Sequence, residues 1–518
     1  MEQIPILSLI LFITVIAALA LVVMPRDKKQ NIRLFALGAS LISFILTLFV
    51  WFGFDSNAPG FQYVEDYTWY AAINSSFHIG VDGLSLTMVL LATLLTPLAI
   101  LASFKIDKNV NVLMALFLFL ETGMLGVFLS LDLMLFFVFW EIGLVPMYFL
   151  ISQWGSEGGE RELWSGRKMS ARGYASFKFL IYTMAGSLGL LLAIQMVGVV
   201  SGTFDMVVLF RTWPQVSGTL FGLPAATVKT VAFWAFALAF AIKVPVWPFH
   251  TWLPDAHTEA PTGGSMLLAG VMLKLGAYGF LRLVLPLFPV EAKAAAGVLA
   301  LLATMAIVFG AFAAFGQRDF KRLVAYSSVN HMGFVILGIA AAAYAVGGPD
   351  AESATIALNG AVLQMFNHGL SAAGMFFLVG VIYERTHTRD LDEIGGGHFP
   401  KIPVYGGILI FTSMASLGLP GLNGFVSEFL VVRGAWPIFT LYTALSMLGL
   451  LFTGAYILKG IASTLYGAHN EHKGREITDI TRREIAVIAP LMALMLWLGI
   501  WPAWLLGVIN NAVQTIFG

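Results

Sequence analysis

The chain has 518 residues, of which 58% are hydrophobic and only 11% charged, with a formal net charge of zero. Soluble domains carry about 25% charged residues, so this composition excludes an ordinary soluble protein and indicates a membrane protein with many spans. The balanced charge gives no sign of a nucleic-acid partner. The chain has no cysteine, which excludes disulfides and thiolate-held iron–sulfur clusters.

The first apolar run covers residues 4–24. Glu2 precedes it, and the basic residues Arg26, Lys28 and Lys29 follow it, which is the reverse of the order in a cleavable signal peptide. We therefore expect a first membrane span whose N-terminus lies outside.

A helix needs about 20 apolar residues to cross a bilayer, and the chain contains about fourteen such runs. The seventh and twelfth runs are long and contain Pro and Gly, so we expect these helices to be broken. The runs lie near 4–24, 31–53, 83–104, 110–130, 132–152, 174–200, 228–256, 262–286, 294–315, 322–346, 355–382, 403–432, 437–466 and 483–511.

The loop charges support this count. With an outer N-terminus, the loops expected outside hold only Arg211, Lys229, Lys293 and Arg433, while the loops expected inside hold most of the remaining Lys and Arg. Because basic loops stay on the cytoplasmic side, both termini are predicted to lie outside a bacterial inner membrane.

The two halves of the chain show a weak internal similarity. WEIG (140–143) in span 5 corresponds to NHMG (330–333) in span 10, and the break at 243–248 corresponds to the break at 418–424. Paired broken helices are typical of inverted repeats with a transport site between them. We expect one all-α membrane domain, 1–518, with five-helix inverted repeats of spans 4–8 (110–286) and 9–13 (294–466), flanked by 1–104 and 483–511.

Two lysines lie deep inside apolar spans. A charge near the bilayer centre costs at least about 2.5–3.5 kcal/mol, so Lys243 and Lys274 indicate a protein that moves charge. Glu141, mid-way along span 5, is the natural partner of Lys243, which stands just before Pro245 where the helix opens. Lys274 has no acid within a helical turn, so burial favours its neutral form and lets it load and release a proton.

Further ionisable residues lie at similar depth in the second half. Glu428 follows the break in span 12, and His331 and His368 lie on spans 10 and 11. A single membrane histidine is often only a hydrogen-bonded core residue, but two of them between a lysine and a glutamate are typical of a proton relay.

Three other groups are secondary candidates. Glu121 in span 4 is a second acid for the first half. Lys178 near the start of span 6 either relays protons from the inner face or extends to that face, and Lys459 in span 13 is expected to contact inner water.

The segment 250–264 contains His250, Asp255, His257 and Glu259. Their spacing matches no metal-binding motif, so we expect no metal site. We interpret the segment as a polar inner loop that shapes the access to Lys243 and Lys274.

Four runs of the sequence resemble the antiporter-like subunits of respiratory complex I. The runs are LDLMLFFVFWEIGLVPMYFLI (131–151), KVPVWPFHTWLPDAHTEAPTGGSMLLAGVMLKLGAYGFLR (243–282), QRDFKRLVAYSSVNHMGFV (317–335) and GLPGLNGFVSEFL (418–430). The resemblance implies fourteen helices with two inverted repeats, an ion pair of Glu141 with Lys243, a central Lys274, a connecting His331 and a terminal Glu428. The acidic Glu428 favours the M type, also called the mitochondrial subunit 4 type, because the L and N types and the cation antiporters carry lysine there.

The resemblance further implies a proton-translocating subunit of an NADH:quinone oxidoreductase with no redox centre of its own. FMN, iron–sulfur clusters and quinone are expected on partner subunits, and L-type and N-type chains and lipids are the expected neighbours. The alternatives are a subunit of a multisubunit cation/proton antiporter, a structural membrane scaffold and a membrane arm of a hydrogenase.

Overall fold

Long apolar runs form the helices of this protein. The computed structural model describes residues 4–162, 166, 168–345, 347–467 and 477–517. Among these residues, thirteen helices are long and apolar enough to cross a membrane, and a shorter apolar helix covers 403–417. The prediction of an all-α membrane protein with many spans is confirmed.

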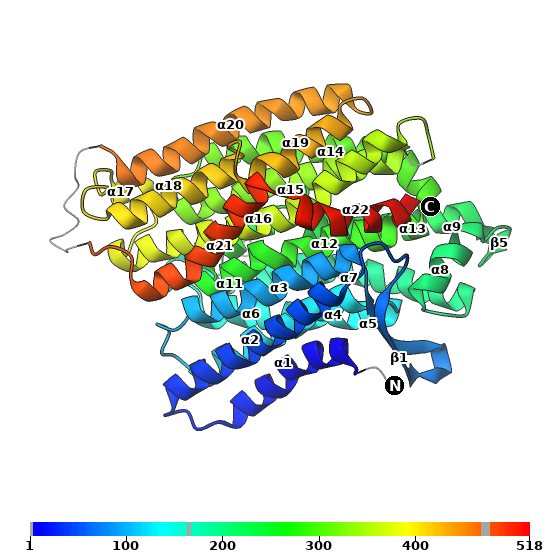
Figure 1. The fold of residues 1–518 in the computed structure, drawn as a ribbon, viewed down its shortest axis with the longest axis horizontal. Coiled ribbons are helices and arrows are strands. Elements are labelled where there is room, and N and C mark those ends of the chain that lie inside the picture. The colour runs from blue at the N-terminus through cyan, green and yellow to red at the C-terminus, as the bar shows by residue number, and fades with distance from the viewer. Residues whose placement is uncertain (1–3, 163–165, 167, 346, 468–476, 518) are drawn as a thin grey trace.

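Most helices run side by side along one common direction (Figure 1). Both chain ends lie at the same end of this bundle, beside the β1 and β5 hairpins, and we call it the terminal face. The other end, where α17 lies, is the opposite face.

The helices follow one another along the chain. The first part contains α1 (Ile6–Val23), α2 (Lys29–Gly53), α3 (Gly83–Ala102) and α4 (Val110–Leu129). The middle part contains α5 (Leu133–Ile142), α6 (Leu144–Trp154), α7 (Ala171–Ser201), α8 (Met206–Thr212), α9 (Ala225–Lys243), α10 (Trp252–Glu259), α11 (Thr262–Leu267), α12 (Leu273–Gly279) and α13 (Leu285–Leu287). The last part contains α14 (Pro289–Phe315), α15 (Phe320–Ala345), α16 (Ala351–Thr386), α17 (Leu391–Ile394), α18 (Pro403–Leu417), α19 (Asn423–Ala435), α20 (Thr440–Leu465), α21 (Arg482–Ile500) and α22 (Ala503–Phe517).

The two expected helix breaks lie where Pro and Gly predict them. Helix α9 ends at Lys243, two residues before Pro245, because a proline removes a backbone donor. Helix α18 ends at Leu417, its C-cap Gly418 has a φ of +83° that suits glycine, and α19 begins at Asn423. Each break therefore leaves backbone groups free for buried side chains at mid-bundle depth.

Two further breaks were not predicted. The fifth span divides at Gly143 into α5 and α6, two residues after Glu141. The last span was expected to be continuous over 483–511. That expectation is wrong, because α21 ends at Ile500 and α22 begins after Pro502. Pro502 cannot continue a helix without losing a hydrogen bond, which explains the second break.

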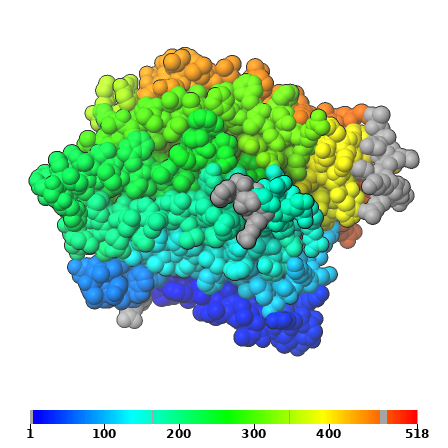
Figure 2. Space-filling view, turned by 180° about the vertical axis from the view of Figure 1, so that it is seen from behind, coloured from blue at the N-terminus to red at the C-terminus, as the bar shows by residue number. Residues whose placement is uncertain are grey.

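The centre of the bundle is made by α16 and by the continuous segment from α11 to α13, which are buried on all sides. This segment includes two π-helical turns, η3 (Leu268–Met272) and η4 (Phe280–Val284). By contrast, α1 and α2 lie at the margin and are largely exposed. Seen from behind, the middle of the chain fills the surface between the N-terminal and C-terminal helices (Figure 2).

Three small two-stranded antiparallel sheets occur in the described residues, none of them predicted. They are β1 (Gln62–Tyr70) with β2 (Ser75–Val81), β3 (Glu160–Glu162) with β4 (Lys168–Ser170), and β5 (Thr219–Leu220) with β6 (Leu223–Pro224). The β1–β2 hairpin holds the start of α1, since Glu65 accepts a hydrogen bond from the Leu7 backbone N–H at 2.8 Å. The hairpin therefore holds the start of α1 in place at the terminal face.

Candidate functional site

The central lysine is bonded directly to a histidine. Lys274 lies on α12, fully buried, and its Nζ is 2.7 Å from Nδ1 of His368 on α16. The same Nζ donates to the carbonyl of Ala269, which the π-helical turn η3 leaves accessible. When Lys274 donates to Nδ1, the proton of the neutral imidazole is on Nε2, which then donates to Ser328 Oγ at 3.1 Å.

The second histidine is bonded to a glutamate. His331 on α15 places Nδ1 2.7 Å from Oε1 of Glu428 on α19, and both side chains are buried. Gln364 on α16 also donates to this carboxylate oxygen, at 2.9 Å. A charged group needs such partners to remain buried, so α15, α16 and α19 together hold Glu428 in place.

The two pairs join into one row. The ring centroids of His331 and His368 are 5.6 Å apart, with the rings tilted by 43°. Lys274, His368, His331 and Glu428 thus follow one another across α12, α16, α15 and α19. Lys274 was expected to have no partner, yet His368 contacts it directly.

Lys243 and Glu141 do not form the expected ion pair among the contacts of the described residues. Lys243, 2% exposed, instead places Nζ over the ring of Trp140 at 4.9 Å, a cation–π contact. Glu141 is half-buried, and its Oε1 finds no hydrogen-bond partner in the described part of the chain. The Lys243–Glu141 pair is therefore open in this structure.

The secondary candidates lie apart from the row. Glu121 is fully buried in α4, and neither carboxylate oxygen is hydrogen-bonded within the described ranges. Lys178 forms an ion pair with Asp255 at 2.7 Å instead of extending freely to the surface. Lys459 donates to the carbonyls of Phe315 and Gln317, at 2.8 and 2.7 Å, and so caps the end of α14.

The segment expected to be a polar inner loop is a buried helix, α10, so that expectation is wrong. Pro254 is tolerated because it lies in the first turn, where its missing N–H has no helical partner. Asp255 binds Lys178 and Arg322, which satisfies its charge inside the bundle. A polar sequence between two prolines resembles a loop, but the surrounding helices bury it.

His257 on α10 was not singled out as a site residue. Its ring stacks on Phe376 of α16, with centroids 4.2 Å apart and planes 11° apart. Both ring nitrogens are buried and without a hydrogen-bond partner among the described residues. Both Lys321 and Lys274 are near enough to act on it electrostatically. No spacing signal in the sequence marks it.

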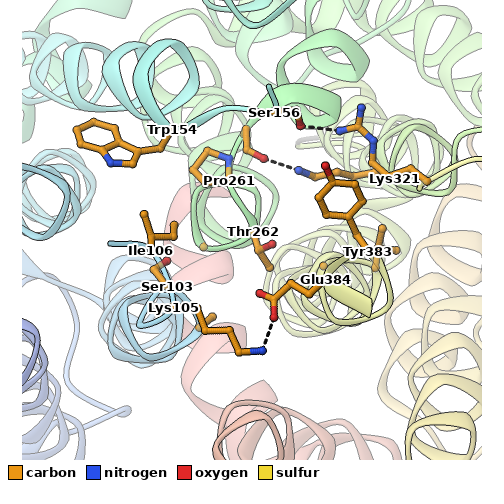
Figure 3. A pocket seen from close by; sticks show the side chains of 16 residues that line it. Ser103, Lys105, Ile106, Trp154, Ser156, Pro261, Thr262, Lys321, Tyr383 and Glu384 are labelled. Carbon is orange, nitrogen blue, oxygen red and sulfur yellow. Dashed lines mark hydrogen bonds and ion pairs between the residues drawn. The ribbon is translucent and has the colours of Figure 1, made fainter. Parts of the chain in front are cut away.

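A cavity of about 180 Å³ opens near the opposite face, at the start of α11. Figure 3 shows Lys321 reaching across it to the carbonyl of Ala260, and Lys105 paired with Glu384 at its rim. Lys321 is buried at the start of α15. The cavity therefore lies beside the end of α10, on the side of the opposite face.

The described residues contain no cluster of His, Asp and Glu arranged to hold a metal ion. The chemistry that the arrangement can perform is proton transfer, since each member of the row exchanges protons reversibly and the row is shielded from lipid.

Comparisons with known proteins show the family of the chain. A family model described as NADH:quinone oxidoreductase/Mrp antiporter, TM, matches residues 130–454. NADH-quinone oxidoreductase subunit M of Rhodobacter capsulatus is 40% identical over 514 residues, covering 98% of this chain and 95% of the relative. NAD(P)H-quinone oxidoreductase chain 4 1 of Nostoc sp. is 37% identical, covering 96% and 89%. The chain therefore belongs to the family of membrane subunits of NADH:quinone oxidoreductases and Mrp antiporters.

Solved structures show the same fold. A chain of respiratory complex I from Thermus thermophilus with bound NADH has a TM-score of 0.82 and 27% identity, covering 99% of this chain and 100% of that one. A chain of the Mrp complex from Dietzia sp. has a TM-score of 0.80 at 19% identity, covering 99% and 97%, which shows a shared fold alone. The resemblance to the antiporter-like subunits of complex I is confirmed.

Proposed function

We propose that this chain is the M-type proton-translocating membrane subunit of an NADH:quinone oxidoreductase. The observation that carries the proposal is the buried row Lys274–His368–His331–Glu428. Groups that cost several kcal/mol to bury persist inside a membrane where they conduct charge. The full-length similarity to NADH-quinone oxidoreductase subunit M favours this role over that of an antiporter chain.

Protons move along the row in single steps. Lys274 hands its proton to His368 across their 2.7 Å contact, and His331 hands one to Glu428 across another 2.7 Å contact. The ring centroids of the two imidazoles are 5.6 Å apart, and the proton passes between these neighbouring rings. Breaking a hydrogen bond to a charged group changes the free energy by about 1.5–3 kcal/mol, which is comparable with about 2.3 kcal/mol for one charge against 100 mV.

The cavity at the opposite face supplies the protons. We place that face inside and the terminal face outside, in agreement with the basic loops. Lys321 lines this cavity, and His257, which senses the charges of both Lys321 and Lys274, is the intermediate station towards the row. Lys178, bound to Asp255 on the same α10 helix, stands beside this route.

Lys243 and Glu141 couple the proton row of this chain to the neighbouring subunit. Helix α9 packs so tightly on α12 that a Cβ added to Gly276 would lie 2.6 Å from the Phe240 carbonyl oxygen. A movement of the Lys243 ammonium from Trp140 to Glu141 therefore changes the electrostatic field at Lys274, which lies two residues from Gly276 on α12. Glu141 is only half-buried, so it can respond to the charges of a neighbouring subunit.

The partners of this subunit supply the redox chemistry. FMN, iron–sulfur clusters and quinone lie on other subunits, and the chain itself has no cysteine to hold a cluster. Its neighbours in the bacterial inner membrane are L-type and N-type chains and lipids, with the peripheral redox arm reached through them. Both termini lie outside.

The test uses the intact complex in proteoliposomes, with the number of protons pumped per NADH as readout. Lys274→Met is expected to lower this ratio while the redox arm still oxidises NADH, because the central carrier is lost. Lys293→Met, at an exposed lysine of α14, is the matched control and should pump normally. An unchanged ratio in assembled Lys274→Met complex contradicts the proposal. Pumping driven by a sodium gradient without NADH would support the antiporter alternative, and loss of assembly alone the scaffold.

A further inference from the structure

A second buried column leads from the central lysine to the terminal face. Lys274, Tyr278 and Arg282 are spaced by four residues along the segment α12–η4, so each lies about one helical turn beyond the last. All three are buried, with Arg282 only 5% exposed. This column offers a proton on Lys274 a direction other than the row through His368.

The middle of the column is occupied by a fixed hydroxyl. Tyr278 donates its O–H to the carbonyl of Phe128, at the end of α4, at 3.0 Å. It also accepts a hydrogen bond from Arg282 Nε at 3.1 Å. The Phe128 ring packs edge-on against it, with centroids 5.1 Å apart. Because the hydroxyl proton is held on Phe128, Tyr278 cannot pass a proton outward without breaking this bond.

The outer end of the column carries a buried ion pair. Arg282 places Nη2 2.5 Å from Asp82 Oδ1, and its guanidinium lies 4.9 Å from the ring centroid of Phe61. Asp82 also accepts from the Ser85 N–H at 2.9 Å as the N-cap of α3. A guanidinium stays charged at every physiological pH, and a fixed arginine in a pore excludes protons electrostatically.

Water reaches the far side of this pair. An open cavity of about 570 Å³ lies on the terminal face between the loop after α2, the start of α3, and α22. Asp82, Ser56 and Asn511 line it. Lys274 and Arg282 are eight residues apart, about 12 Å along the helix, so the first half would have a short route to outer water if Arg282 were absent.

We propose that the Arg282–Asp82 pair seals the column, so that a proton on Lys274 leaves only through His368. The seal rests on the proposed proton pathway and determines the direction in which a proton leaves Lys274. The positive charge of Arg282 repels a proton that moves outward from Lys274. Asp82 holds the guanidinium in place and compensates its buried charge. Protons that returned from the outer cavity would meet the same barrier.

The test measures passive proton flux through the resting complex in proteoliposomes, without NADH, under an imposed potassium–valinomycin potential. The double variant Arg282→Gln with Asp82→Asn removes both charges and keeps a hydrogen bond between the two side chains. We expect its passive flux to rise several-fold above the natural protein. Arg282→Lys, which keeps the charge, is the matched control and should remain as tight as the natural protein.

A third variant shows which route the flux takes. Adding Lys274→Met to the double variant should return the flux to the natural level, because the leak passes through Lys274. If the double variant does not assemble, Arg282→Gln alone, which leaves Asp82 facing the cavity, is measured with the same expectation. Natural-level flux in the uncharged variants, equal leakage in Arg282→Lys, or a leak that survives Lys274→Met would each overturn the seal. Failure of the pathway itself would appear separately, as NADH-driven pumping that survives Lys274→Met.

Discussion

The Nδ1 atom of His331 lies 2.7 Å from Oε1 of Glu428, inside a bundle where both side chains are shielded from water. This contact joins α15 to α19, the second half of the broken span. A proton that arrives on the imidazole therefore has an acceptor at hydrogen-bond distance, on a helix that begins after the break at Gly418.

Removing the charge at Glu428 should stop proton release. Glu428→Gln keeps the shape of the side chain and its hydrogen bond with Gln364, but it cannot carry a proton. We expect the protons pumped per NADH to fall and the amount of assembled complex to remain. Glu352→Gln, at an exposed residue near the start of α16, is the control. Normal pumping by assembled Glu428→Gln would remove Glu428 from the pathway.

Replacing His368 should affect transport and stability together. His368→Leu leaves Lys274 without the imidazole that lies 2.7 Å from it, so a buried donor loses a partner, at a cost of about 1–3 kcal/mol. We expect slower pumping and a lower unfolding temperature of the purified complex. In a double-mutant cycle, Lys274→Met in the His368→Leu background should cause less further loss of pumping than Lys274→Met alone. Additive losses would mean that the two residues act independently.

Much of the site was predictable from the sequence because depth in an apolar span and isolation from other charges are local properties. Lys274, His331 and Glu428 were recognised in this way, and Pro245 marked the break of span 7 because a proline removes a hydrogen bond wherever it stands. The direct partner of Lys274 was not recognised, since the contact with His368 depends on how α12 packs against α16.

The remaining misses have the same physical origin. Helix α10 is polar, and polar runs with proline usually lie in solvent, but here neighbouring helices bury it and its Asp255 is neutralised by Lys178. The position of His257 against Phe376 follows only from the packing of α10 on α16. The open Lys243–Glu141 pair depends on side-chain rotamers, which sequence patterns do not encode.

Asp132 should be a structural anchor at the terminal face. Its Oδ1 accepts from the backbone N–H groups of Met134 and Leu135, at 2.8 and 3.0 Å, and from Ser75 Oγ at 3.0 Å. Asp132→Ala removes the N-cap of α5 and the bond to β2, and we expect a loss of about 1–2 kcal/mol. Asp132→Asn keeps an oxygen that can cap the helix and should recover most of it. Faster hydrogen exchange at Met134 and Leu135 in the alanine variant measures the effect, and equal exchange in both variants would contradict it.

A pH-dependent contact closes the same face. His78 Nδ1 on β2 lies 3.1 Å from Asp205 Oδ2, at the N-cap of α8. Burial alone would lower the pKa of His78, but the nearby carboxylate of Asp205, with smaller contributions from Asp66 and Asp132, raises it above its usual value. The pKa of Asp205 is lowered although burial opposes this, because the His78 imidazole lies beside its carboxylate.

The stability from this contact should be lost at high pH. A histidine whose pKa is raised in the folded state contributes fully below the pKa of the unfolded chain, and the contribution disappears as pH rises through the folded pKa. We expect amide exchange in β2 and at the start of α8, corrected for the intrinsic effect of pH, to be slower at pH 6 than at pH 9, by a difference of about 1 kcal/mol. His78→Gln should remove this pH dependence, whereas the control His387→Gln at the end of α16 should keep it. Corrected protection that is equal at the two pH values in the natural protein would show that His78 carries no charge in this contact.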